Sequence, residues 1–246
     1  MKKTVIMVVA SLAFCAWADT ETIGGYTWTY RINGDTAEIY KGFNKAAISP
    51  LPTGSLAIPS KLGGRPVTCI GSHAFSFCEE LTAVTIPEGV TSIDSRAFEF
   101  CRELTHVTIP ESVVHVGDAF YGCDSLYDTT TIPNVASVDG WVFGLAEDGQ
   151  YVSGYPSSFE GFLDLTGCRG IAEGAFIDCK GLTGVLLPSG VKSILRFAFQ
   201  DCDRLTSVTI PDSVKYIGEG AFCGCSALKS LVVAGGNPCK VIRELK

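Results

Sequence analysis

The chain has 246 residues, of which 46% are hydrophobic and 18% are charged, and its formal net charge is −7 at pH 7. This hydrophobic content excludes a disordered chain. The acidic balance argues against nucleic acid as a partner, because phosphate binding needs clustered Lys and Arg, and no such cluster follows residue 3.

Residues 1–18 are predicted to be a signal peptide that is removed from the folded protein. Two lysines begin it, residues 5–14 form an apolar run, and Ala16-Trp17-Ala18 supplies the small-x-small pattern that a signal peptidase cleaves. The run is too short to cross a bilayer, which takes roughly 20 residues. We find no later apolar stretch that could act as a transmembrane segment.

Cys15 allows a second interpretation of this segment, lipid attachment at the lipobox-like Leu12-Ala13-Phe14-Cys15. Phe14 fits poorly at a position where a small residue is wanted. Export followed by release is therefore the simpler prediction, which makes the protein secreted or associated with the cell surface.

Residues 19–54 are predicted to form a β-rich N-terminal cap and a linker. Aromatic and β-branched residues alternate from Gly25 to Lys41 around the pair Asn33-Gly34, which is a strong β-hairpin signal. Such a cap covers the apolar end that the first unit of a stacked array would otherwise expose.

A 23-residue phrase that starts at Leu81 recurs almost in register from Leu104, Leu182 and Leu205. Self-similarity at this period indicates a stacked solenoid. Repeats are predicted over residues 55–143 and 163–233, separated by an irregular insertion at 144–162 and followed by a tail or cap at 234–246.

Within one repeat, Leu81, Val84 and Ile86 fit the L-x-x-L-x-L strand of a leucine-rich repeat, which leaves Thr85 exposed on the sheet. Pro87 ends the strand because it cannot donate a ladder hydrogen bond. The predicted fold is therefore a leucine-rich-repeat solenoid with short parallel β-strands, helical or 3₁₀ turns and a β-hairpin cap.

One phenylalanine per repeat is expected to stack in an internal spine. The seven residues are Phe75, Phe98, Phe120, Phe143, Phe176, Phe199 and Phe222. Six cysteines, each three residues after such a phenylalanine, form a second column. They are Cys78, Cys101, Cys123, Cys179, Cys202 and Cys225.

These cysteines are predicted to be buried thiols, since a small apolar residue is needed there and free Cys serves as one. Disulfides along the column are the alternative. Four cysteines outside it are better candidates for oxidation: Cys69, Cys168, Cys223 and Cys239. No CxxC pair occurs, so no zinc site is predicted.

The phrase IPxxVxxIxxxAFxxCxxLxxVxIP resembles the BspA-like leucine-rich repeat family of bacterial surface and secreted proteins, over roughly residues 55–143 and 163–233. The resemblance implies adhesin-like binding to host matrix proteins or to other cells. It transfers no functional residues, because the shared motif is structural.

Neither a catalytic site nor a cofactor or metal site is predicted. The repeat register separates His73, His106 and His115, and no serine or threonine has a matched histidine. One acidic cluster, Asp164 with Glu147, Asp148 and Glu160, breaks the repeat pattern and motivates a hydrolase-like or calcium site as an alternative. It lacks the spacing of a calcium loop.

Functional residues are best sought where the repeat rules are broken. The exposed strand face supplies candidate protein-binding residues: Thr85, His106, Thr108, Asp128, Asp164 and Thr209. The irregular segment supplies further aromatic residues. Trp141 and Phe162 are expected to fill the core there, whereas Tyr151 and Tyr155 are either contact anchors or core residues.

The predicted function is therefore that of an exported, non-enzymatic module whose solenoid surface binds a protein or a cell-surface ligand. A self-associating spacer of the envelope is the first alternative. A hydrolase-like site in the central insertion is the second.

Overall fold

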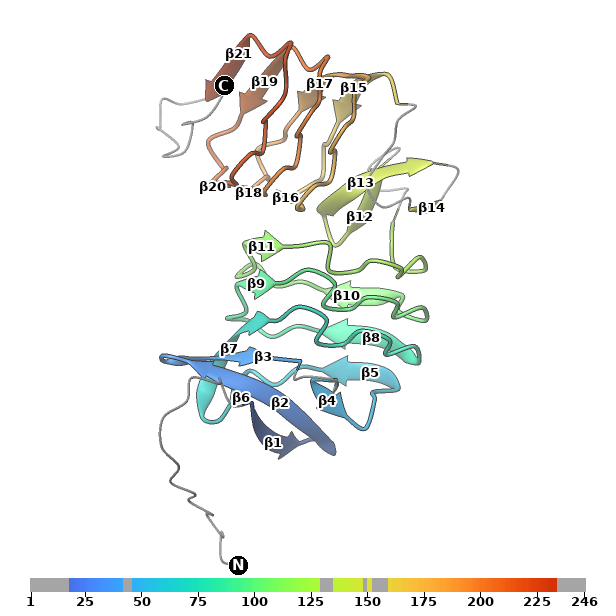
Figure 1. Ribbon diagram of the computed structural model, residues 1–246, viewed down its shortest axis with the longest axis vertical. Coiled ribbons are helices and arrows are strands. Elements are labelled where there is room, and N and C mark those ends of the chain that lie inside the picture. The colour runs from blue at the N-terminus through green and yellow to red at the C-terminus, as the bar shows by residue number, and fades with distance from the viewer. Residues whose placement is uncertain (1–17, 42–45, 129–134, 148–149, 152–158, 234–246) are drawn as a thin grey trace, which may run out of the picture.

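The computed structural model describes residues 18–41, 46–128, 135–147, 150–151 and 159–233. These residues form short β-strands joined by tight turns, and none of them lies in an α- or 3₁₀-helix. None of their elements is therefore a helix long and apolar enough to span a membrane. The strands stack in a solenoid of about seven turns, with the first strands at one end and the last at the other (Figure 1).

An antiparallel cap begins the fold. It contains β1 (Asp19–Ile23), β2 (Tyr26–Asn33), β3 (Thr36–Ile39) and β4 (Ile48–Ser49), and β2 pairs with the other three. Gly34 has φ 62° in the turn between β2 and β3, so the predicted β-hairpin is confirmed. The ring of Trp28 lies edge-on to Phe75 at 6.1 Å between centroids and covers the first coil.

The first block of coils contains two parallel ladders. The first ladder consists of β5 (Gly54–Ala57), β8 (Leu81–Thr85) and β10 (His106–Thr108). The second consists of β7 (Arg65–Ile70), β9 (Ser92–Ile93) and β11 (His115–Val116), with β6 (Lys61–Leu62) beside β7. Because β3 pairs in parallel with β7, the cap continues into the second ladder.

The second block repeats this plan. Its first ladder consists of β15 (Gly161–Asp164), β17 (Leu182–Leu186), β19 (Ser207–Ile210) and β21 (Ser230–Val233). Its second ladder consists of β13 (Trp141–Glu147), β16 (Gly170–Ile171), β18 (Ser193–Ile194) and β20 (Tyr216–Ile217). Two short strands, β12 (Val135–Val138) and β14 (Gln150–Tyr151), pair antiparallel with β13.

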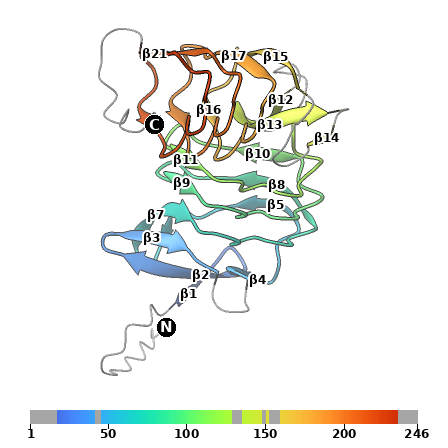
Figure 2. The same cartoon turned by 45° about the horizontal axis from the view of Figure 1, so that its top comes forward.

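Both ladders are interrupted between the blocks. In the described part of the chain β10 pairs only with β8, and β11 pairs only with β9. The second block stacks on the β10–β11 end of the first, and its long strands run at an angle to β8 and β10 (Figures 1 and 2). The sheets of the solenoid are therefore discontinuous, and its buried side chains form two clusters, of which the first extends into the second block through Ala172 and Leu195.

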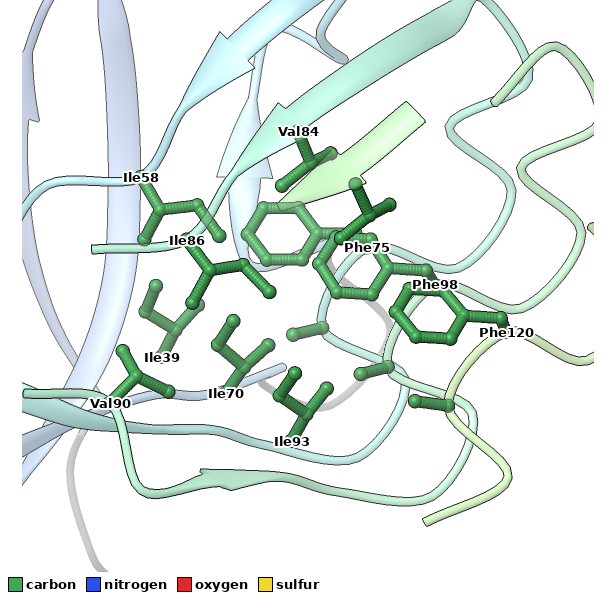
Figure 3. Close-up of a cluster of buried hydrophobic side chains, with 14 of the residues drawn as sticks. Ile39, Ile58, Ile70, Phe75, Val84, Ile86, Val90, Ile93, Phe98 and Phe120 are labelled. Atoms are coloured by element: carbon green, nitrogen blue, oxygen red, sulfur yellow. The ribbon is translucent and has the colours of Figure 1, made fainter. Parts of the chain in front are cut away.

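The phenylalanine column forms the predicted internal spine. In the first block Phe75, Phe98 and Phe120 are fully buried and stacked, with centroids 5.0 and 5.4 Å apart (Figure 3). Phe176, Phe199 and Phe222 stack in the same way in the second block, at 5.1 and 5.3 Å. Phe143 is also buried but lies edge-on to Phe120, at an interplanar angle of 78°.

The turn that carries this column is not the helical or 3₁₀ turn that the sequence predicted. The N–H of Phe75 donates to Ala97 in the next coil at 2.7 Å, whereas the N–H of Ser76 donates back to His73 at 3.2 Å. This alternation recurs along the turn in the following coils. Because every second N–H points to the neighbouring coil, the i→i+3 bonds cannot form a continuous helix.

The cysteine column consists of free thiols, as predicted. Cys101 donates its S–H to the carbonyl of Phe75 at 3.2 Å, and Cys123 donates to Phe98 at 3.0 Å. Cys202 and Cys225 repeat this contact in the second block. Each thiol therefore fills a small buried space and also binds the phenylalanine carbonyl of the preceding coil.

Replacing Phe98 by Ala should lower the free energy of unfolding by about 3–5 kcal/mol, because the ring is fully buried between two others. Phe100, at φ 56° on the surface of the same turn, provides the control. Phe100→Gly should cost less than about 2 kcal/mol, since glycine accepts a positive φ that is strained for Phe. Urea unfolding measures both variants, and equal losses would contradict the assignment of the spine.

Iodoacetamide at pH 8 should alkylate the exposed Cys223 in the native protein and leave intact the five column thiols that are buried, Cys78, Cys101, Cys123, Cys179 and Cys202. Burial raises the pKa of Cys179 to about 11, which keeps its thiol protonated and unreactive. Mass spectrometry of peptides before and after denaturation measures this difference. Column cysteines that resist alkylation even in denaturant, until a reductant is added, would show that they are disulfide-bonded.

Candidate functional site

The strand face, which we define as the exposed face of the two first ladders, carries most of the predicted binding residues. In the first block Thr85 and Thr108 are directly paired on β8 and β10, and His106 lies two residues before Thr108. All three are exposed, and the Thr108 hydroxyl is 3.4 Å from His106 Nε2. The structure therefore brings these three predicted residues together in one polar patch.

Asp164 and Thr209 lie on the strand face of the second block, on β15 and β19, and both are exposed. Asp164 accepts hydrogen bonds from the backbone N–H and the hydroxyl of Thr166, at 2.9 and 2.6 Å, and these bonds lower its pKa. Glu160 of the same acidic cluster is instead paired with Arg204 at 3.1 Å. These two carboxylates thus have separate structural partners.

Three of the predicted site residues are not on the described strand face. Asp128 is half-buried and forms an antiparallel bridge with Ser137 between the blocks, because the chain leaves the repeat path there. Its assignment to the strand face was wrong. Tyr151 belongs to β14, but its side chain, like all of Tyr155, lies outside the described residues.

The strand face of the second block carries large exposed apolar side chains beside Asp164 and Thr209. Phe162 is 62% exposed, Val232 is 51% exposed and Leu186 is 46% exposed. A Cβ built at Gly184 on the neighbouring strand would lie 2.8 Å from the ring of Phe162, so the ring rests on the glycine. The prediction that Phe162 fills the core was wrong, whereas the same prediction for Trp141, which is 1% exposed, is confirmed.

A row of aromatic residues follows the surface of the turns in the first block. The rings of Phe77, Phe100 and Tyr121 are 5.3 and 5.5 Å apart, with Arg96 over Tyr121 and Arg102 over Phe100. Phe77 and Phe100 have φ near +60°, which is costly for a bulky residue. Phe77 and Phe100 each lie two residues after a phenylalanine of the spine. At the same position four other coils carry smaller residues, also with positive φ: Gly122, Asp178, Asp201 and Gly224.

The junction between the blocks is held by Arg169. Its guanidinium donates to the carbonyls of Asp139 and Ile109, each at 2.6 Å, and to the carboxylate of Asp139 at 2.8 Å. The same carboxylate accepts the backbone N–H of Ile109, just after β10, at 2.8 Å. Arg169 therefore satisfies backbone groups at the point where the first ladder stops.

Glu38, Cys69 and Asp94 are the one group of described residues whose ligand atoms lie close enough to hold a metal ion. Glu38 is already bound to Arg31 at 2.7 Å and to Asn33 at 2.9 Å. Burial raises the pKa of Cys69 to about 12, so the thiolate that a metal requires is strongly disfavoured. The arrangement is better suited to a hydrogen-bonded network between coils.

The geometry defines a leucine-rich-repeat solenoid with its exposed contacts spread over several coils. The chain belongs to the BspA-type leucine-rich repeat family, whose description, "BspA type Leucine rich repeat region", matches in six copies over residues 55–148 and 157–243. This confirms the family that the repeat phrase resembled. The match points to a repeat scaffold and to no family of enzymes.

Among solved structures, a leucine-rich repeat protein of T. pallidum is 25% identical, with 82% of this chain and 87% of that one covered and a TM-score of 0.41. A leucine-rich repeat protein of Bacteroides ovatus is 24% identical over 82% of this chain, which spans 51% of that protein, with a TM-score of 0.34. A leucine-rich cell surface protein of Faecalibacterium prausnitzii is 20% identical, with 89% and 96% covered and a TM-score of 0.24. No curated protein matches the chain.

Arg169→Met should lower the free energy of unfolding by about 1–2 kcal/mol, because the part-buried carbonyl of Ile109 and both acceptors of Asp139 lose the guanidinium. Arg169→Lys should lower the free energy of unfolding almost as much, since one ammonium group cannot reach all the acceptors that the guanidinium binds. Arg204→Met, at an exposed ion pair, is the control and should cost less than about 1 kcal/mol. Urea unfolding measures all three, and a neutral Arg169→Met would exclude a stabilising role at the junction.

Proposed function

We propose that this protein is an exported, non-enzymatic binding module whose strand face contacts another protein or a cell surface. The observation that carries the proposal is the exposed apolar group Phe162, Leu186 and Val232 on the second block. Large apolar side chains that gather on a surface favour a protein partner, because a monomer gains nothing from keeping them in water.

The two blocks would contribute different kinds of contact. Phe162, Leu186 and Val232 supply the apolar area that becomes desolvated, and Thr85, His106 and Thr108 supply polar contacts on the first block. Thr209, Asp164 and the tyrosines 151 and 155 remain candidate contacts beside them. The signal-like residues 1–18 and the family both favour export to the cell surface or beyond.

The two alternatives make different demands on the protein. A self-associating spacer would use the same apolar face between copies of this chain and would change size with concentration. A hydrolase-like site would require Asp164 and Glu160 to act together, and their separate bonds to Thr166 and Arg204 disfavour this. Binding to a different partner is therefore the function that the surface supports best.

The experiment is binding of the protein to arrayed matrix proteins, glycans and bacterial cells. Phe162→Ser/Leu186→Ser should reduce a saturable signal at least tenfold, because it removes the apolar centre of the contact. Thr85→Ala/His106→Ala should reduce it less. Leu51→Ser is the matched control, since Leu51 is 52% exposed and lies outside the strand face.

Each variant is first checked for native stability by urea unfolding, so that loss of binding is not loss of fold. A signal that survives Phe162→Ser/Leu186→Ser unchanged would reject the strand face as the contact. Light scattering over a range of concentrations tests the spacer alternative, and growth of the particle with concentration would favour it over the proposal.

A further inference from the structure

A second surface of the molecule gathers aromatic side chains, along the turns that follow the spine in the first block. Phe77 is 51% exposed, and Phe100 and Tyr121 are half-buried beside it. Because their rings lie 5.3 and 5.5 Å apart, they form one row over three coils, which we define as the aromatic edge. None of the three residues belongs to a strand, so the aromatic edge is separate from the strand face.

The two phenylalanines of the aromatic edge occupy positions that are unfavourable for them. Phe77 has φ 62° and Phe100 has φ 56°, a left-handed backbone conformation that is strained for a bulky residue. Burial does not offset this strain, since Phe77 keeps about half of its surface in water. Residues held in such conformations gather at functional sites. The chain thus keeps exposed rings where Gly or Asp would fold with less strain.

Exposed carboxylates flank the aromatic edge, at the third to fifth positions after the start of each turn column. They are Glu79, Glu80, Glu103 and Asp124. None of them belongs to an ion pair among the residues that the structure describes. Their negative charge is therefore available to a partner.

A hollow of about 260 Å³ brings one ring and one carboxylate together. Phe100, Gly122 and Asp124 line it, with Arg102 and Ser125. Its size depends on the glycine, because the ring of Phe100 lies where a side chain at Gly122 would stand. The hollow has an aromatic wall beside a carboxylate, which suits the apolar stem and the charged end of a Lys or Arg side chain.

The two arginines of the aromatic edge do not reverse its charge. Arg96 is 3.4 Å from Glu99 and 3.5 Å from Asp118, so two carboxylates offset it. Arg102 lies over the ring of Phe100, with its guanidinium carbon 5.7 Å from the ring centroid. It is a single cation beside the four carboxylates, and the surface remains acidic.

We propose that the aromatic edge binds a cationic segment of another protein, in which Lys or Arg residues lie among apolar ones. The cations pair with the carboxylates, and the apolar side chains cover the exposed rings of Phe77 and Phe100. Ring faces also attract cations, which favours the same partner. An anionic partner would face four carboxylates with only Arg102 to bind it. The proposal does not rest on the function proposed for the strand face.

The probe is a labelled peptide of repeated Lys-Leu-Gly-Ser units, and fluorescence anisotropy with the full chain at low ionic strength measures its affinity. Two control peptides carry Gln in place of Lys or Ser in place of Leu. The probe should bind at least tenfold more tightly than either control, and 1 M salt should weaken it at least tenfold. Absence of saturable binding would overturn the proposal. Equal affinity for either control would also overturn it, because the surface would then select charge or apolar area alone.

Phe77→Asn/Phe100→Asn tests the rings without a loss of fold, since Asn tolerates a positive φ. The variant should unfold in urea near the native midpoint and bind the probe at least fivefold more weakly. Phe162→Ser/Leu186→Ser should bind it as the native chain does. A loss of affinity in this second variant alone would place the peptide on the strand face and overturn the proposal.

Glu79→Gln/Glu103→Gln tests the carboxylates and should weaken the probe several-fold. Glu88→Gln/Asp212→Asn is the matched control, because it removes equal charge from exposed residues outside the aromatic edge and should preserve the affinity. Equal losses in the two variants would show a response to net charge alone and reject this site.

Arg102→Met determines the sign of the partner's charge at this surface. It removes the one cation beside the four carboxylates, so it should tighten binding of the cationic probe. A weaker probe in Arg102→Met, together with a tighter one in Glu79→Gln/Glu103→Gln, would mean that the aromatic edge prefers an anionic partner, which contradicts the proposal.

Discussion

Each coil of this solenoid is completed by the next one, and the other features of the structure follow from that constraint. Alternate N–H groups of the turn donate to the neighbouring coil, and four of the six column thiols donate to a carbonyl one coil away. The phenylalanine rings are buried only because another ring lies on each side. A coil therefore has little stability alone, and the stack needs both a cap and continuity.

Continuity fails once in the described chain, where both ladders stop between the blocks. Phe143 turns edge-on to Phe120, β12 and β13 pair antiparallel, and Arg169 binds the carbonyls that no strand takes up. These contacts join the two blocks at the point where the buried side chains divide into two clusters. They do not close the outer side of the junction, which is why a cavity and two unpaired donors remain there.

The sequence was sufficient for the fold because the same columns recur at a constant spacing. It predicted the spine, the thiols and the hairpin cap from residues that each repeat shares. The prediction that Phe162 fills the core failed, because periodicity alone does not show that Gly184 lies beside it. The glycine has no side chain, so the ring can lie over it on the surface. The prediction of the turn also failed, because inter-coil hydrogen bonds override the local pattern of helix formation.

The cavity could not be predicted from the sequence for a related reason. Its lining comes from positions as far apart as Val113 and Tyr216, which only the folded chain brings together. Ser193 occupies the same column as Ser92 and His115, so its type carries no signal of its own. What distinguishes Ser193 is that it is 1% exposed and that its hydroxyl has no hydrogen-bond partner.

A regular array presents nearly equivalent surfaces on every coil, so specificity for a ligand must come from departures from the repeat. On the strand face Phe162, Leu186 and Val232 replace small or polar residues, and the register between β15 and β17 shifts at Phe162. At the junction both ladders are interrupted, and a cavity of about 490 Å³ lies beside the break. A broad, additive contact therefore suits the strand face, where several side chains on different coils are exposed together.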